Sequence, residues 1–270
     1  MLSSSFFRPA WRAGALFLLL NVAAVAAPFN IVVNFLGGLS PTQQAIFSTA
    51  ATTWTTLLPN YQAGINIPSL TISAQGSAID GVGGVLGSAG PDGITNQGGF
   101  WLSTTGSMEF DTADLANLEA NNLLLPVILH EMAHVMGFGT LWNLNNVYAP
   151  ILNPGEFTGD NAVAAYQAEF NQPGSLFVPV ELGGGQGTAG GHWDEVNGGA
   201  GPTGIVSAQG DKQFELMTGW INTPYYISNT TIASFVDIGY EAAAPVGIPE
   251  PGTMTLFGAG IVLIALYRRR

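Results

Sequence analysis

Two histidines and a glutamate stand close together in the stretch His130-Glu131-Met132-Ala133-His134, and Gly137 follows three residues later. Histidines at positions i and i+4 project from the same face of a helix, so both imidazoles can bind one metal ion. The glutamate between them points away from that ion and can act as a general base on a zinc-bound water. The pattern therefore predicts a helical zinc site with Glu131 as its base.

The segment that carries this motif, residues 123–136, is predicted to be a buried helix. Apart from the three motif residues and Pro126, every residue in it is apolar. A helix that is apolar all round lies inside the protein, where two imidazoles and a carboxylate without partners would be unfavourable. A bound metal ion removes that problem. The composition of the helix thus favours a metal site over the alternative, a chance occurrence of the motif.

A catalytic zinc site commonly takes a third protein ligand, and three patterns compete for it here. A histidine ten residues after the first would complete a compact motif, but that position is Thr140. Glu156 could serve from a following helix, although the Asn153-Pro154-Gly155 before it is typical of a turn. His192 stands 58 residues after His134 and is the one remaining histidine of the chain. A solvent-exposed His192 without a role is the alternative to this third pattern.

Other elements must position these residues. We expect a strand over 29–35, a helix from Ser40-Pro41 to about residue 59, and a second strand over 70–73. The glycine-rich segment 80–91 lacks the context of a phosphate loop and predicts turns in a sheet. Residues 107–110 predict a short edge strand, which either pairs with an extended substrate or is an ordinary strand edge. After Gly137 the chain becomes loop-rich, with a helix over 160–170 that Asp160 could cap and a flexible glycine run over 183–191.

Both ends of the chain are typical of targeting segments. Residues 1–26 combine Arg8 and Arg12, a short apolar run and an Ala-Val-Ala site, which indicates a cleaved secretory signal peptide; an uncleaved anchor is the alternative. Residues 249–270 contain Pro-Glu-Pro, a 15-residue apolar segment and three arginines. This tail resembles the PEP-CTERM sorting signal, which implies a Gram-negative bacterium and processing by an exosortase. A plain transmembrane anchor is the alternative.

Removal of both ends leaves a strongly acidic protein. Residues 27–248 contain one lysine and 17 acidic residues, a net charge of −16. Such a surface repels nucleic acids, which excludes DNA or RNA as partners, and it attracts cations or basic substrates. The chain has no cysteine, so disulfides and thiol-based latency are excluded.

In combination, these motifs resemble the leishmanolysin-like metallopeptidases, a metzincin family. The matching residues are His130, Glu131, His134 and Gly137, then His192-Trp193 after a long insertion, the Met217 turn in 215–219, and a closing helix over 231–240. The resemblance implies that His130, His134 and His192 bind one Zn²⁺ and that Met217 lies beneath it. Well-known relatives are rich in disulfides and many carry a pro-segment, and this chain departs from both features.

These inferences define one expectation for the whole chain. We expect an α+β, metzincin-like fold: a mixed twisted sheet with the active-site helix (27–139), a loop-rich C-terminal part (140–241), then a linker over 242–248 before the tail. The expected function is that of an exported zinc endopeptidase of the cell envelope or extracellular space, transiently anchored by its tail, which hydrolyses proteins or peptides. A non-catalytic surface or matrix adhesion protein is the alternative. Calcium binding near Asp80 or Asp92 is conceivable, but no loop has an EF-hand pattern.

Overall fold

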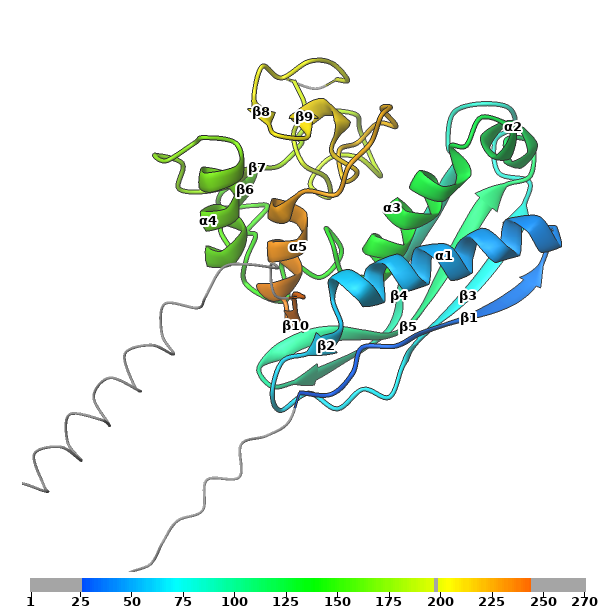
Figure 1. The fold of residues 1–270 in the computed structure, drawn as a ribbon, viewed down its shortest axis with the longest axis horizontal. Helices are drawn as coiled ribbons and strands as arrows, with labels where there is room; N and C mark the ends of the chain where they lie inside the picture. Colours follow the sequence, from blue (N-terminus) through cyan, green and yellow to red (C-terminus); the bar gives the residue numbers. More distant parts are fainter. Residues whose placement is uncertain (1–25, 197–198, 244–270) are drawn as a thin grey trace, which may run out of the picture.

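A computed structural model describes residues 26–196 and 199–243. Residues 1–25 of the predicted signal peptide, residues 244–248 of the linker and the sorting tail lie outside the described residues. Within the described ranges, no helix is both long enough and apolar enough to cross a membrane. The described chain forms a mixed α/β structure, with a sheet and two long helices on one side and a loop-rich part on the other (Figure 1).

The sheet contains four strands in the order β1 (Ile31–Gly37), β3 (Leu70–Ser77), β5 (Phe100–Asp111) and β4 (Gly87–Gln97). The first three strands are parallel, and β4 is antiparallel to β5. Along β3, Leu70, Ile72 and Ala74 are buried while the residues between them are partly exposed. This alternation of period two places one face of the sheet against the core.

The prediction that residues 107–110 form an edge strand is wrong. They belong to β5, where Ser107 pairs with Ser73 of β3 on one side and with Gly90 of β4 on the other. The edge is occupied by β4, which begins inside the segment that was interpreted as turns. Glycine and proline between Gly87 and Pro91 conceal this strand, because they are depleted in strands and carry no hydrophobic alternation.

Two helices cover the buried face of the sheet, as Figure 1 shows. Helix α1 (Pro41–Leu57) begins with a capping box, in which the Ser40 side chain accepts from Gln43 N and the Gln43 side chain accepts from Ser40 N. Its Trp54 is fully buried and donates from Nε1 to the carbonyl of Leu129, 3.0 Å away, in α3 (Leu124–Met136). Both helices were predicted with these boundaries to within a few residues.

A glycine in the middle of β5 allows α3 to lie close to the sheet. A Cβ atom on Gly106 would overlap Val135 Cγ1 of α3 and would lie 2.7 Å from the Gly90 carbonyl oxygen of β4. Any larger residue would therefore push the helix and the sheet apart. Val135 is the neighbour of His134. The contact with Gly106 therefore determines how close the histidines of α3 lie to the sheet.

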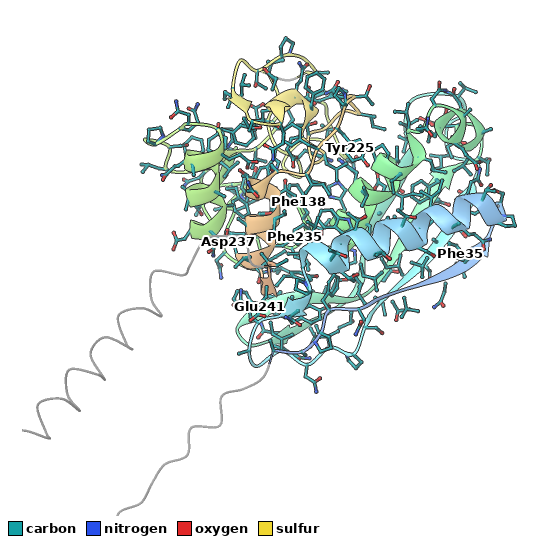
Figure 2. All side chains as sticks on the ribbon, viewed as in Figure 1. Phe35, Phe138, Tyr225, Phe235, Asp237 and Glu241 are labelled. Carbon is teal, nitrogen blue, oxygen red and sulfur yellow. The ribbon has the colours of Figure 1, made fainter. Side chains whose placement is uncertain are left out.

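The C-terminal part is held by aromatic packing rather than by long elements. The rings of Trp142 and Trp193 stack with centroids 5.1 Å apart, and Phe138 packs edge-on against Trp193 at 5.0 Å. Figure 2 shows Phe138 and Phe235 between the helical layer and this loop-rich part.

Several further elements are short: α2 (Leu115–Ala120), β2 (Asn60–Tyr61), β6 (Glu156–Phe157), β7 (Val178–Pro179), β8 (Val206–Ser207), β9 (Gly210–Asp211), a 3₁₀ turn (Lys212–Phe214) and β10 (Tyr240–Glu241). Strand β10 pairs with β2.

Helices α4 (Asp160–Glu169) and α5 (Asn229–Val236) cap one another. Asp237, after the end of α5, accepts from the backbone N–H groups of residues 161 and 162 at the start of α4. Glu169, at the end of α4, accepts from the N–H groups of Asn229 and Thr230 at the start of α5. Asp160 therefore does not have the capping role predicted for it, because a carboxylate from a distant segment fills that role. The predicted closing helix over 231–240 is shorter than expected, since α5 ends at Val236.

Candidate metal centre

Helix α3 presents two imidazoles to a common point. His130 and His134 are one turn apart, and their Nε2 atoms lie 3.0 Å from each other. Gly137 ends the helix with a φ of 121°, a conformation that favours glycine. The chain then turns so that the Phe138 carbonyl oxygen accepts a hydrogen bond from His134 Nδ1 at 2.9 Å.

A distant loop brings His192 to the same point. Its Nε2 atom lies 2.9 Å from that of His130 and 3.0 Å from that of His134. Within residues 26–196 and 199–243, these three side chains are the one group of histidines, cysteines or acidic residues arranged to hold a metal ion. Glu156, the competing candidate, is not part of it and lies in the short strand β6.

The second ring nitrogen of each histidine determines its tautomer. The Nδ1 atoms of His130, His134 and His192 lie 2.8–2.9 Å from the carbonyl oxygens of Leu216, Phe138 and Thr188. A carbonyl can only accept, so each Nδ1 carries the proton and each Nε2 presents a lone pair. The close approaches among the Nε2 atoms are therefore not hydrogen bonds. Three converging lone pairs repel one another unless a cation lies between them, and this donor set fits a zinc ion.

Burial keeps the imidazoles neutral. It lowers the pKa of His130 to about 3, aided by the neighbouring His134 and opposed by the hydrogen bond to Leu216. Burial likewise lowers the pKa of His134, and it lowers that of His192 well below the ordinary value, with both other histidines adding to the effect. Metal ligation requires the neutral form of an imidazole, so the three rings are in the protonation state that binds a cation.

Glu131 lies on the same helix, with its side chain on a different face from the histidines. It is buried, with 9% of its surface exposed, and it lines the same cleft as His130 and His192. Burial raises the pKa of its carboxyl group to about 7. A carboxyl group with such a pKa can both accept and release a proton near neutral pH.

His130 and His192 open into a cleft of about 540 Å³. Its walls come from the turn before β4, from α3, from the glycine-rich run and from the segment after the Met217 turn. Apart from His130, Glu131 and His192, the residues lining it are uncharged: Gly84, Val85, Leu86, Gly87, Val127, Gln186, Gly187, Thr188, Ala200, Thr218, Gly219, Trp220, Ile221 and Asn222. The cleft can thus accommodate an uncharged segment of chain beside the three-histidine group.

Sequence reasoning missed two contributors to this site. The wall over Gly84–Gly87 belongs to the segment interpreted as sheet turns, and nothing in its composition marks it as part of a cleft. The buried Glu215 lies in the 215–219 turn, where the sequence pointed only to Met217, which is itself fully buried. A signal for Glu215 existed, because it is an acidic residue in a turn of otherwise uncharged residues. The expected calcium candidates Asp80 and Asp92 belong to no second metal-binding group among the described residues.

A mixed sheet, a buried helix and a three-histidine centre together define an α/β protein with a candidate metal site. The family model described as Leishmanolysin matches residues 102–245, just over half of the chain, and this range includes all three histidines. The chain therefore belongs to the leishmanolysin family of metallopeptidases. A PEP-CTERM protein-sorting motif matches residues 247–270. Both resemblances inferred from the sequence are confirmed, and no curated protein sequence matches the chain.

Proposed function

We propose that this protein is an exported zinc-dependent endopeptidase in which His130, His134 and His192 hold one Zn²⁺ and Glu131 is the general base. One observation carries the ligand set: three Nε2 atoms lie within 3.0 Å of one another while every Nδ1 is committed to a carbonyl. Membership of a metallopeptidase family supports peptide-bond hydrolysis, and the sorting motif supports export to the envelope of a Gram-negative bacterium.

Zinc, when bound there, would polarise the scissile carbonyl and make a water molecule more acidic. Glu131 takes the proton of the attacking water on its carboxylate and delivers it to the departing amine. In the metal-free protein, burial raises the pKa of Glu131 to about 7. The carbonyl oxygens that accept from the three Nδ1 atoms hold the rings in one tautomer.

The substrate would bind as an added strand. Strand β4 ends the strand order of the sheet, and its first residue, Gly87, lines the cleft. A peptide in extended conformation could pair with this edge and place one uncharged side chain near Val127, Trp220 and Ile221. The net charge of −16 over residues 27–248 disfavours acidic substrates.

The remaining features of the expected metzincin arrangement belong to this proposal. Met217 would pack beneath the metal ion, Gly137 would let the chain turn away below it, and the two parts 27–139 and 140–241 would form the walls of the substrate cleft. Cleavage of the signal peptide over 1–26 and processing of the tail over 249–270 by an exosortase-type enzyme would yield the final protein.

Glu131→Gln tests the base, with Glu156→Gln as the matched control because Glu156 lies outside the three-histidine group. The Glu131 variant should retain stoichiometric zinc and lose at least about a hundredfold in kcat/KM, since general base catalysis contributes about 10²–10⁴. The control should cleave casein at the wild-type rate until a chelator is added. Normal cleavage by Glu131→Gln would show that the assigned base is wrong. A zinc-loaded wild type that cleaves no protein would instead favour the adhesion alternative.

A further inference from the structure

Glu215 holds a carboxylate in the protein interior, directly beside the turn that carries Met217. The side chain is 2% exposed. Its Oε2 atom accepts from the Met217 N–H at 2.6 Å. Its Oε1 atom accepts from Ser228 N at 3.0 Å, Ser228 Oγ at 2.9 Å and Thr231 Oγ1 at 2.6 Å. Burial raises the pKa of this carboxyl group, and the four donors oppose that shift, which is the arrangement that a negative charge requires in a buried position.

One peptide group joins this carboxylate to His130. The carbonyl oxygen of Leu216 accepts from His130 Nδ1 at 2.8 Å. The N–H of the same peptide group is that of Met217, and it donates to Glu215. Hydrogen bonds in such a chain polarise one another. The negative charge of Glu215 therefore makes the Leu216 oxygen a stronger acceptor for the His130 proton.

A second path leads from Glu215 towards His192. The indole Nε1 of Trp193 donates to Thr231 Oγ1 at 2.8 Å, so the Thr231 hydroxyl directs its own proton to Glu215. The backbone N–H of Trp193 also donates to the Met217 carbonyl at 2.9 Å. The residue after the third histidine is thus fixed to the same turn and to the same carboxylate.

We propose that Glu215 is a positioning residue of the metal centre. It acts on His130 through the Leu216–Met217 peptide group. It also holds His192 in position through Thr231 and Trp193. The inference rests on the proposed function in one respect, that the histidines bind zinc. Histidines that bind metals usually donate their other N–H to a carboxylate or a carbonyl, and that partner sets orientation and basicity. Here a carboxylate exerts this influence at a distance of one peptide group.

The effect should be largest at His130. The peptide group that accepts from His192 Nδ1 has the N–H of Ala189 at its other end, and this N–H donates to the Gly185 carbonyl rather than to a carboxylate. A neutral acceptor polarises a peptide group less than a negative charge does. In the zinc-loaded wild type, the Nδ1 proton of His130 should therefore resonate further downfield than that of His192.

A purely structural role for Glu215 can be separated from this one, because the chain provides a matched control. Glu169 also accepts three hydrogen bonds at the N-terminus of α5, from Asn229 N, Thr230 N and Thr230 Oγ1, but none of these groups leads to a histidine. Glu169→Gln and Glu215→Gln both weaken the capping of the same helix. Only Glu215→Gln turns an amide N–H₂ group towards the donors that connect to the metal centre.

The test compares zinc affinity of the two variants by chelator competition, with the absorption spectrum of the Co²⁺-substituted proteins as a second readout. Glu215→Gln should raise the zinc dissociation constant about tenfold or more, change the Co²⁺ spectrum and move the His130 Nδ1 proton upfield. Glu169→Gln should lose thermal stability. It should keep the zinc dissociation constant, the Co²⁺ spectrum and the His130 Nδ1 proton shift of the wild type. Equal zinc affinities in the two variants would overturn the proposal.

The wild-type measurement decides the case if Glu215→Gln does not fold: a His130 Nδ1 proton no further downfield than that of His192 would also overturn the proposal. None of these readouts requires turnover. A protein whose zinc affinity depends on Glu215 but which cleaves no peptide would support the positioning role and contradict the proposed function. A wild type that binds no zinc would overturn both.

Discussion

Substitution of Gly106 by alanine should move helix α3, which carries His130 and His134. A Cβ atom at this position would lie 2.7 Å from the Gly90 carbonyl oxygen and closer still to Val135 Cγ1. Carbon atoms pack at about 3.5–4.0 Å, so α3 and β5 would have to separate by about 1 Å. Val135 cannot rotate out of the way easily, because a β-branched side chain in a helix has one preferred rotamer.

The cost follows from these distances. Overpacking of a core contact costs about 1–3 kcal/mol, and a structure of this size loses about 2–4 °C in Tm for each kcal/mol. His134 adjoins Val135, so the displacement reaches the candidate metal centre directly. A misplacement of about 1 Å at a catalytic site can reduce the rate about a hundredfold. Gly106→Ala should therefore lower Tm by several degrees and reduce kcat/KM and zinc affinity together.

Gly90→Ala is the matched control on the neighbouring strand, since a Cβ atom there meets nothing within 4 Å. It should keep the wild-type Tm and activity, whereas the double variant Gly106→Ala/Val135→Ala should recover part of the loss by removing the closest methyl group. Thermal unfolding and steady-state kinetics on the same preparations measure all three. If Gly106→Ala were as stable and as active as Gly90→Ala, the reasoning from close packing would be refuted.

Two further predictions concern other parts of the structure. Gly219→Ala should overlap the Thr188 methyl group and displace the carbonyl that accepts from His192 Nδ1; zinc affinity should fall, and Thr188→Ser in the same protein should restore it. Burial lowers the pKa of Lys212 from 10.5 to about 8. Between these values the folded protein has released a proton that the unfolded chain still holds, so its free energy of unfolding should rise with pH. Urea unfolding should show this rise in the wild type and not in Lys212→Met. If the free energy of unfolding changed equally with pH in both proteins, the lowered pKa of a buried Lys212 would be contradicted.

Much of the fold around the site could be predicted because its signals are local. The helix start at Ser40-Pro41 and the apolar run around His130 depend on residues a few positions apart. The edge strand could not be predicted, because β4 is rich in glycine and its place in the sheet depends on pairing with β5. The cap of α4 was misassigned for the same reason: Asp237 lies 76 residues from Asn161 in the chain.

The sequence by itself determined the residue types and the local spacing of the candidate site. Helical periodicity places His130 and His134 on one face and Glu131 on another, and the residue types predict a pair of metal ligands with a base. Only the tertiary structure decided which distant group joins them and what supports it. Long-range packing brought His192 within 3.0 Å of both rings and set Glu215 beneath the Leu216–Met217 peptide group. No local pattern encodes such contacts, because they depend on how the loop-rich part folds back on α3.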